Sequence, residues 1–239
     1  MNKDQIYSSA LATVANFEFD AQVADVFSDM IERSVPGYRS IITMIKTLTE
    51  HYAQPSSTLY DLGCSLGAAT LSMARGLVVG DCTLVAVDNS SAMIERCRTA
   101  TANCSVPIQL IEGNIQEIEI TNASVVVLNF TLQFIPLDER RALLEKISQG
   151  MRPGGVLILS EKVCFADSHL DQLLIDIHHD FKRAQGYSDL EVSQKRAALD
   201  NVLVPESILV HRERLCEVGF SSVDVWFQCF NFMSMLAVK

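Results

Sequence analysis

The chain lacks the features that would place it in a membrane, on a nucleic acid or in an oxidising compartment. It has no apolar run near the length that a bilayer requires, and its first residues show no signal-peptide pattern. Acidic residues outnumber basic ones by 29 to 19, and the net charge of −10 argues against a broad phosphate-binding face. The seven cysteines are scattered and form no Cys-x-x-Cys pair. We therefore expect a cytoplasmic protein with reduced thiols, no metal, no membrane contact and no direct nucleic-acid partner.

Hydrophobic residues make up 49% of the 239 residues, enough for one α/β domain with a sizeable core, which we expect to span residues 1–239. Residues 1–57 are predicted to be helical. Apolar residues recur at helical spacing over residues 20–31, and Pro36-Gly37 interrupts the pattern before it resumes over residues 40–51. This part should form N-terminal helices before the sheet begins.

From residue 58 onward, apolar runs alternate with helical segments, a pattern typical of a parallel sheet with helices on both faces. Strands are predicted over residues 58–62, 83–88, 107–112, 124–130 and 156–160. The run over 124–130 is apolar on both faces and should be central, and Pro153-Gly154-Gly155 should form a turn before the fifth strand. A helical insertion over 168–218 should cover the carboxyl edge of the sheet, where ligands bind in such folds. Two runs, 223–228 and 231–238, should add an antiparallel pair, giving seven strands in a mostly parallel, Rossmann-like sheet.

The first strand ends in a glycine turn that is the most informative motif of the chain. Gly63 and Gly67 follow the apolar run, and a helix starts directly after them. Glycine lets the backbone approach a ligand, and a helix N-terminus offers N–H donors. The second strand ends in Asp88, whose carboxylate could accept both hydroxyls of a ribose or could cap the strand end. The pair predicts a site for a nucleotide-like ligand.

Three other interpretations of the glycine turn stay open. A nicotinamide or flavin site would need Gly-x-Gly-x-x-Gly, but Ser65 stands at the second glycine and the third comes one place early. Gly63-Cys64-Ser65-Leu66-Gly67 also fits the nucleophile elbow of α/β-hydrolases, with Asp176 and His211 as downstream partners. No convincing strand precedes residue 58, which disfavours an elbow. A purely structural turn is the third possibility.

Other polar residues close the next strands. Asn129 ends the valine-rich fourth strand, where a polar side chain has little structural reason to stand. The third strand runs into Glu112-Gly113-Asn114-Ile115, and Asn114 could accept from an adenine amino group or be a simple turn asparagine. Because the carboxyl ends of parallel strands share one edge of a sheet, we expect these residues near Asp88 and Asn89.

The combination Asp61-x-Gly63-x-Ser65-x-Gly67 with Asp88 resembles the S-adenosyl-L-methionine (SAM) site of class I methyltransferases. A more specific resemblance spans nearly the whole chain. In order, the segments that carry it are 35–38, 60–70, 87–90, 128–134, 178–184, 193–196 and 226–232. Together they are similar to the carboxy-S-adenosyl-L-methionine synthase family, which shares the methyltransferase fold without methylating.

The resemblance implies a reaction and its partners. SAM and prephenate would become carboxy-SAM and phenylpyruvate, and a downstream tRNA carboxymethyltransferase would use carboxy-SAM to modify wobble uridine. It also implies a homodimer. The cofactor residues carried over by position are Tyr38, Gly63, Cys64, Ser65, Asp88, Asn89, Asn114, Ile115, Asn129 and Arg196. The family usually has aspartate in place of Asn114, so we expect weaker binding there at most.

Arg196, the expected catalytic residue, separates the possible functions. A cation beside the sulfonium of SAM would repel it, whereas a carboxylate placed there could bind the guanidinium fork. Alone on a charged helix, Arg196 would be a solvated surface residue, and only the resemblance reverses that interpretation. His178 and His179 could equally be packing residues. Two alternatives remain: a SAM-dependent methyltransferase acting on a small acid or tRNA, and a non-catalytic SAM-binding protein.

Overall fold

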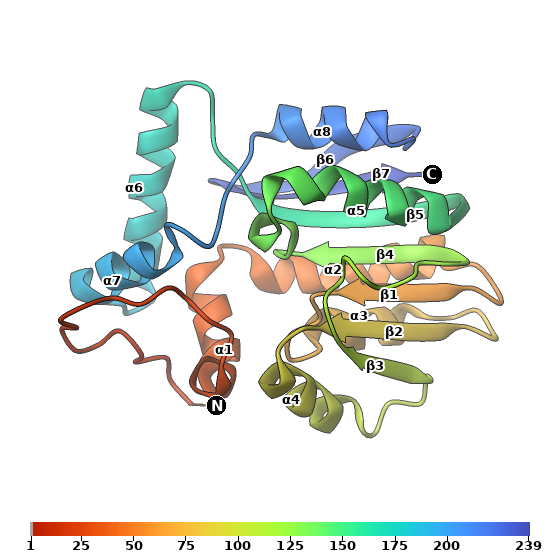
Figure 1. Cartoon of the computed structure of the whole chain (residues 1–239), viewed down its shortest axis with the longest axis horizontal. Coiled ribbons are helices and arrows are strands. Elements are labelled where there is room, and N and C mark those ends of the chain that lie inside the picture. Colours follow the sequence, from red (N-terminus) through yellow and green to blue (C-terminus); the bar gives the residue numbers. More distant parts are fainter. Residues whose placement is uncertain (1) are drawn as a thin grey trace.

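The computed structural model describes residues 2–239 and places seven strands in one sheet of order β3-β2-β1-β4-β5-β7-β6 (Figure 1). The strands are β1 (Thr58–Leu62), β2 (Thr83–Asp88), β3 (Ile108–Glu112), β4 (Ala123–Asn129), β5 (Met151–Lys162), β6 (Ser222–Cys229) and β7 (Phe232–Val238). β1 to β5 pair in parallel, whereas β7 is antiparallel to both β5 and β6. This confirms the predicted mostly parallel seven-stranded sheet.

The strand order reverses between β1 and β4, because the chain first builds outward through β2 and β3 and then returns. A crevice opens at such a reversal, at the carboxyl ends of the strands. β4 lies in the middle of the sheet, as predicted. Val125 and Val127 point to one core layer and Val126 and Leu128 to the other, and all four are fully buried.

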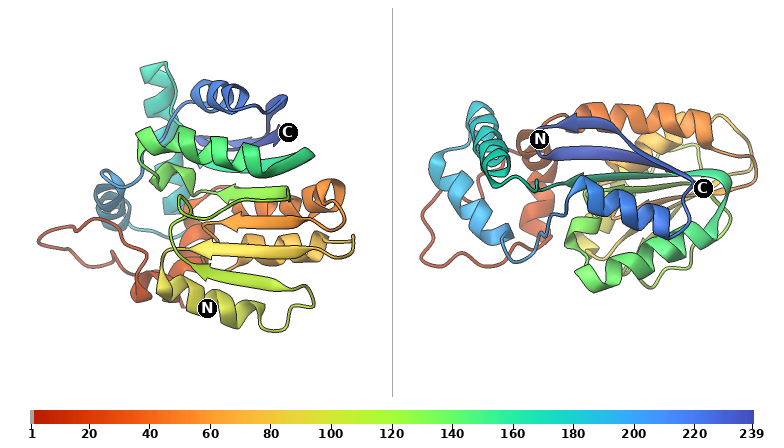
Figure 2. Two further views of the ribbon diagram at one scale, coloured as in Figure 1. Left: turned by 45° about the vertical axis from the view of Figure 1, so that its right-hand side comes forward. Right: turned by 90° about the horizontal axis from the view of Figure 1, so that it is seen from above.

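Helices cover both faces of the sheet, as Figure 2 shows. The helices are α1 (Ala21–Ser34), α2 (Tyr38–Tyr52), α3 (Ala68–Gly76), α4 (Ser91–Thr101), α5 (Leu137–Gly150), α6 (Ser168–Ala184), α7 (Asp189–Leu199) and α8 (Ile208–Glu217), with a short 3-10 helix η1 (Leu132–Phe134). Residues of α2, α3 and α4 fill one core layer, and residues of α5 and α8 fill the other. Within residues 2–239, every helix is too short or too polar to cross a bilayer.

The insertion divides between two places. α6 and α7 lie with α1 beyond the carboxyl ends of the parallel strands, as expected (Figure 1). The expectation that all of 168–218 covers this edge is wrong for α8, which packs against β6. Leu215 of α8 is fully buried in the core layer that α5 helps to fill, so this helix is part of the sheet's cover.

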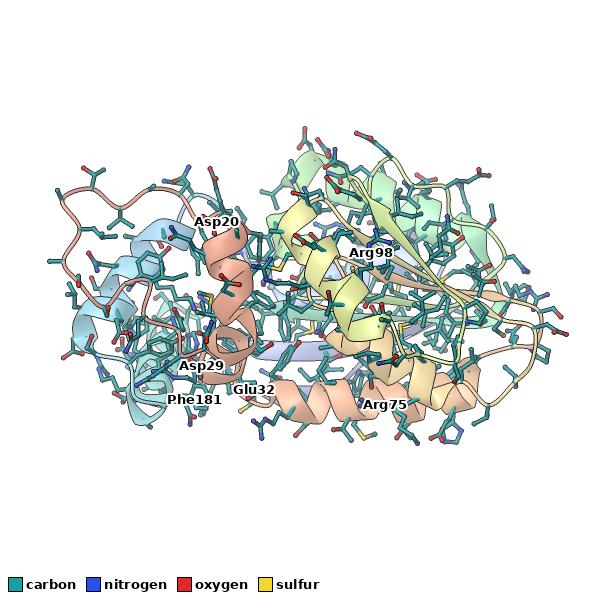
Figure 3. The ribbon with its side chains drawn as sticks, turned by 90° about the horizontal axis from the view of Figure 1, so that it is seen from below. Asp20, Asp29, Glu32, Arg75, Arg98 and Phe181 are labelled. Atoms are coloured by element: carbon teal, nitrogen blue, oxygen red, sulfur yellow. The ribbon has the colours of Figure 1, made fainter. Side chains whose placement is uncertain are left out.

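The prediction of helix over residues 1–57 is wrong for residues 2–20, which are irregular; Met1 lies outside the described residues. This segment makes few hydrogen bonds within itself and is bonded to α7. Gln194 accepts from Leu11 N at 2.7 Å and donates to the carbonyls of Tyr7 and Ser9 at 3.0 and 2.9 Å. Helix α1 begins only after Asp20, which Figure 3 labels and whose carboxylate accepts from the Val23 N–H.

The expected turn at Pro153-Gly154-Gly155 belongs to β5, which starts earlier than predicted. The β4–β5 register jumps there: Ala123 pairs with Met151, but Val125 already pairs with Val156. The extra residues form a bulge, and Gly154 within it has φ +75°, which suits glycine. A glycine-rich bulge and a turn are alike in sequence, because both need such backbone angles.

Candidate functional site

A cavity of about 670 Å³ lies at the carboxyl ends of the parallel strands, bounded by the strand-end turns and by α1, α6 and α7. This volume suits a small organic ligand. All but one of the predicted ligand residues line it: Tyr38, Gly63, Cys64, Ser65, Asp88, Asn89, Ile115, Asn129 and Arg196. The fold thus brings together side chains that are up to about 160 positions apart in the sequence, which no local pattern shows.

The turn after β1 brings the backbone to the cavity at a glycine. Gly63 has φ +85°, and a Cβ there would lie 2.3 Å from the Thr131 hydroxyl oxygen, so any side chain would clash. The N–H groups of Gly63 and Cys64 both donate to the Val87 carbonyl, at 2.8 and 2.9 Å. The turn is therefore held firmly against β2. The helix N-terminus, from which free N–H donors are expected, comes later, at Ala68.

Asp88 ends β2 and has two structural bonds. Its carboxylate accepts from the N–H of Ser65 at 2.8 Å and from the N–H of Ser90 at 3.0 Å. Burial raises the pKa of Asp88 even though both bonds act to lower it. Each carboxylate oxygen keeps a lone pair free, and the residue lines the cavity. A strand-end cap and a ligand contact are therefore compatible, because the cap orients the same carboxylate.

Asn114 is the predicted ligand residue that does not line the cavity, although Gly113 and Ile115 on either side of it do. Its amide oxygen accepts from Asn89 Nδ2 at 3.3 Å, and its own Nδ2 donates to Glu117 Oε1 at 3.1 Å. Both asparagines are exposed. The pair forms a polar rim, and an adenine contact by Asn114 stays a prediction.

Asn129 and Tyr38 meet the cavity from β4 and from the start of α2. The Asn129 side-chain oxygen is buried and has no hydrogen-bond partner among residues 2–239. Such an orphaned acceptor disfavours the apo state and suits a ligand that donates. Tyr38 packs against Phe130, with ring centroids 6.4 Å apart, and burial raises the pKa of its phenol, which stays neutral.

Helix α7 places Arg196 on the cavity wall. The side chain is exposed, and its guanidinium has no hydrogen-bond or ion-pair partner within residues 2–239. His178 of α6 shares the wall, but its Nε2 donates to the Ser34 carbonyl at 2.8 Å and its ring packs edge-on against Phe232. Burial, and then the nearby Lys182, lower the pKa of His178 to about 3. His178 is thus a neutral packing residue, as the sequence analysis allowed.

Sequence reasoning assigned no role to three lysines of the same wall: Lys162 at the end of β5, Lys182 on α6 and Lys195 on α7. We call Lys162, Lys182, Lys195 and Arg196 the cationic wall, and Gly63, Ser65, Asp88, Ile115 and Asn129 the sheet wall. The sequence nevertheless contained a signal for these three lysines. Lys182 and Lys195 lie inside the segments 178–184 and 193–196 that carry the resemblance, and Lys162 ends a strand much as Asn129 does.

Ser65 is not placed as a hydrolase nucleophile. Its hydroxyl donates to the sulfur of Met93 at 3.5 Å, and no histidine of residues 2–239 is bonded to it. His211 is buried on α8, which covers the face of the sheet opposite to α3, the helix that follows Ser65. Asp176 is exposed on α6. A nucleophile needs a base within hydrogen-bond reach, so the geometry disfavours the elbow.

The sheet wall fits a ligand that donates hydrogen bonds. Asp88 and Asn129 present acceptors to the cavity, and the turn at Gly63 lines it as well. SAM carries such donors in its ribose hydroxyls and its amino group. Among residues 2–239, no three His, Cys, Asp or Glu side chains gather as metal ligands.

Comparisons with known proteins agree with this geometry. Residues 59–155 match a family described as "Methyltransferase domain". The chain is 58% identical to the carboxy-S-adenosyl-L-methionine synthase of Vibrio atlanticus, over 100% of this chain and 99% of the relative. It is 57% identical to that of Vibrio cholerae, over 99% and 97% of the two chains. Among solved structures, an O-methyltransferase family protein of Burkholderia thailandensis superposes with a TM-score of 0.63 at 16% identity, covering 92% of this chain and 60% of the other. That likeness shows the fold alone, the class I methyltransferase fold.

Proposed function

Because this chain belongs to the carboxy-S-adenosyl-L-methionine synthase family, we propose that its cavity joins a carboxyl group from prephenate to the methyl carbon of SAM. The products are carboxy-SAM and phenylpyruvate. Family membership rests on identity along the full chain, so the protein is an enzyme that uses SAM. The choice of prephenate and the roles of individual residues are the proposed part.

The observation that supports the proposal best is the unpartnered Arg196 on a cationic wall. A methyltransferase gains nothing from cations near a sulfonium, since like charges repel. A carboxylated product needs one, because its new carboxylate lies one carbon from the sulfur. The planar guanidinium can bind a carboxylate through two parallel hydrogen bonds. An arginine in this cavity therefore favours carboxylation over methyl transfer.

The sheet wall would hold the nucleoside and the amino-acid tail. Asp88 lines the cavity and would accept from the ribose hydroxyls, and the orphaned oxygen of Asn129 would accept from the amino group. Ile115 and Tyr38 supply apolar surface on either side. These contacts would fix the methyl carbon relative to the cationic wall, which is the positioning that a carbon–carbon bond requires.

The reaction balances without a base from the protein. Prephenate loses its ring carboxylate as carbon dioxide and its ring hydroxyl as hydroxide, and it becomes phenylpyruvate. The hydroxide takes one proton from the SAM methyl group and leaves as water. The electron pair left on that carbon attacks carbon dioxide and forms the new bond. In this series of reaction steps, Arg196 binds the carboxylate that forms, and the neutral His178 takes no part.

The product mass tests the proposal. Incubation of the protein with SAM and prephenate should give a compound heavier than SAM by one carbon dioxide, together with an equal amount of phenylpyruvate. Formation of S-adenosylhomocysteine and a methylated small acid or tRNA would instead support a methyltransferase. SAM that stays bound and unchanged in every mixture would support a non-catalytic SAM-binding protein.

The setting of the reaction is part of the proposal. We expect carboxy-SAM to pass to a downstream tRNA carboxymethyltransferase that modifies wobble uridine, while this chain itself makes no tRNA contact. All seven cysteines are unpaired, which agrees with work in the reducing cytoplasm. We also expect a homodimer, and light scattering during size-exclusion chromatography would test it.

A further inference from the structure

Lys182 is a buried cation without a partner. Lys182 lies on α6, its side chain lines the cavity, and the residue is 6% exposed. Within residues 2–239, its ammonium group makes no hydrogen bond and no ion pair. Burying an uncompensated charge is unfavourable, so such a group marks a place where a ligand supplies the missing charge.

Among residues 2–239, the other buried cations, Arg33, Arg140 and Lys195, each have an ion-pair partner, although Nη2 of Arg33 has no hydrogen bond. Arg140, which is fully buried, donates to Glu206 Oε2 at 2.6 Å and to three backbone carbonyls. Lys195 donates to Ser34 Oγ at 3.0 Å and lies 3.6 Å from Asp4 Oδ2. Lys182 differs from them because its surroundings repel it. Burial, followed by the charges of Lys195 and Lys162, lowers its pKa to about 7.

Two further cations line the same cavity from separate elements. Arg196 is on α7, and Lys162 is at the end of β5. Neither side chain has a hydrogen-bond or ion-pair partner within residues 2–239. Three unpartnered cations in one cavity can bind two carboxylates at separate positions.

We propose that Lys182 and Lys162 bind the 2-oxo-acid carboxylate of the second substrate, the carboxylate that is kept in the product, and leave Arg196 for the carboxyl group that is transferred. This inference rests on the proposed function. Prephenate has two carboxylates with opposite needs. The ring carboxylate loses its charge as carbon dioxide leaves, so a strong ion pair in the ground state would slow its loss. The 2-oxo-acid carboxylate keeps its charge throughout and can be held tightly at no such cost.

Replacement of the two lysines tests the site. In Lys182→Met and Lys162→Met the KM for prephenate should rise more than about tenfold, because a buried charge pair loses one partner. Inhibition by phenylpyruvate, which carries only the kept carboxylate, should weaken by a similar factor, and SAM affinity should hold. Arg183→Gln is the matched control. It removes one charge from the next position of α6, where the side chain pairs with Asp180 and Asp189 outside the cavity, and it should leave both constants unchanged.

Three outcomes would overturn the assignment. Wild-type KM values in both lysine variants would exclude the site. A raised KM for prephenate with unchanged inhibition by phenylpyruvate would move the lysines to the departing carboxylate. A fall in melting temperature of both lysine variants, with SAM and prephenate affinities lost alike, would make the lysines structural, whereas removal of an unpartnered buried lysine should keep or raise that temperature.

A binding measurement separates this inference from the proposed reaction. Prephenate is titrated by calorimetry into the protein saturated with S-adenosylhomocysteine, which has no methyl group to react. Binding by wild type and Arg183→Gln, but much weaker binding by Lys182→Gln, supports the anion site even if wild type forms no carboxy-SAM. Equal binding by all three proteins, or none by wild type, overturns the site even if carboxy-SAM is formed.

Discussion

The sheet wall and the cationic wall line one cavity and differ in both chemistry and construction. The sheet wall offers oxygen acceptors from strand-end turns, such as Asp88 and Asn129, which the parallel sheet itself positions. The cationic wall offers positive charge from α6 and α7, which lie outside the sheet, with Lys162 at the end of β5. The sheet wall follows from a fold that many SAM enzymes share. The cationic wall is the part that can change the reaction.

The largest expected effect comes from Arg196→Ala, which removes the cation that we propose binds the new carboxylate. The preference for carboxy-SAM over SAM should fall by more than about tenfold, because the carboxylate would lose two charge-assisted hydrogen bonds, each worth about 1.5–3 kcal/mol. Affinity for SAM alone should hold or improve as a repulsive charge disappears. Competitive binding of the two ligands to both proteins measures this. Arg196→Lys should recover only part, and an equal preference in wild type and Arg196→Ala would leave Arg196 as a surface residue.

On the sheet wall, Asp88→Ala should weaken SAM binding about ten- to a hundred-fold, since hydrogen bonds to a charged group contribute about 1.5–3 kcal/mol. It also removes the acceptor for the Ser65 and Ser90 N–H groups, so the melting temperature should fall as well. Calorimetry on the folded variant measures the affinity. Asp88→Asn is the control, because it keeps an acceptor for the cap and loses the charge. Unchanged affinity in Asp88→Ala would remove this residue from the ligand site.

A smaller effect is expected for Asn129→Leu. The variant loses one neutral acceptor, worth about 0.5–1.5 kcal/mol, so SAM affinity should fall about two- to tenfold. Because that acceptor has no partner in the free protein, the melting temperature without SAM should not fall. Thermal scans with and without SAM would show both effects. A drop in stability without SAM would mean that Asn129 supports the sheet and not the ligand.

The smallest effect is expected for Ser65→Gly. Ser65 has φ +50°, an angle that glycine adopts without strain, and its contact with Asp88 uses the backbone N–H, which glycine keeps. Carboxy-SAM formation should therefore persist. A serine-directed fluorophosphonate should not label the wild-type protein. Stoichiometric labelling that Ser65→Gly abolishes would revive the hydrolase interpretation.

The two walls also differ in how far sequence could predict them. Strand ends can be predicted from the sequence, because an apolar run such as 58–62 or 83–88 stops at a polar or glycine residue. Parallel strands then bring these ends to one edge of the sheet. Asp88 and Asn129 were placed correctly at the cavity for this reason. Asn114 shows the limit of that logic: its neighbours reach the cavity, while its own side chain turns to Asn89 and Glu117.

The cationic wall could not be derived from local pattern. Lys182 stands among charged residues on an amphipathic helix and would be assigned to solvent, but the packing of α6 beside Ser34 and α7 buries it. Arg196 reached the list of candidates only through the resemblance to a family. The irregular course of residues 2–20 was missed because its bonding partner, Gln194, lies more than 180 positions away.

That long-range clamp has a consequence for anyone who handles the protein. Gln194 lies two positions before Arg196 and bonds to residues 7–11, so it ties the N-terminal segment to α7. Removal of the N-terminal segment should leave the sheet and its nucleoside contacts intact, but α7 should become more mobile. Such a shortened protein would still bind SAM on a column, but it would not react with prephenate. Purification by SAM binding alone would therefore not separate the shortened protein from the intact one.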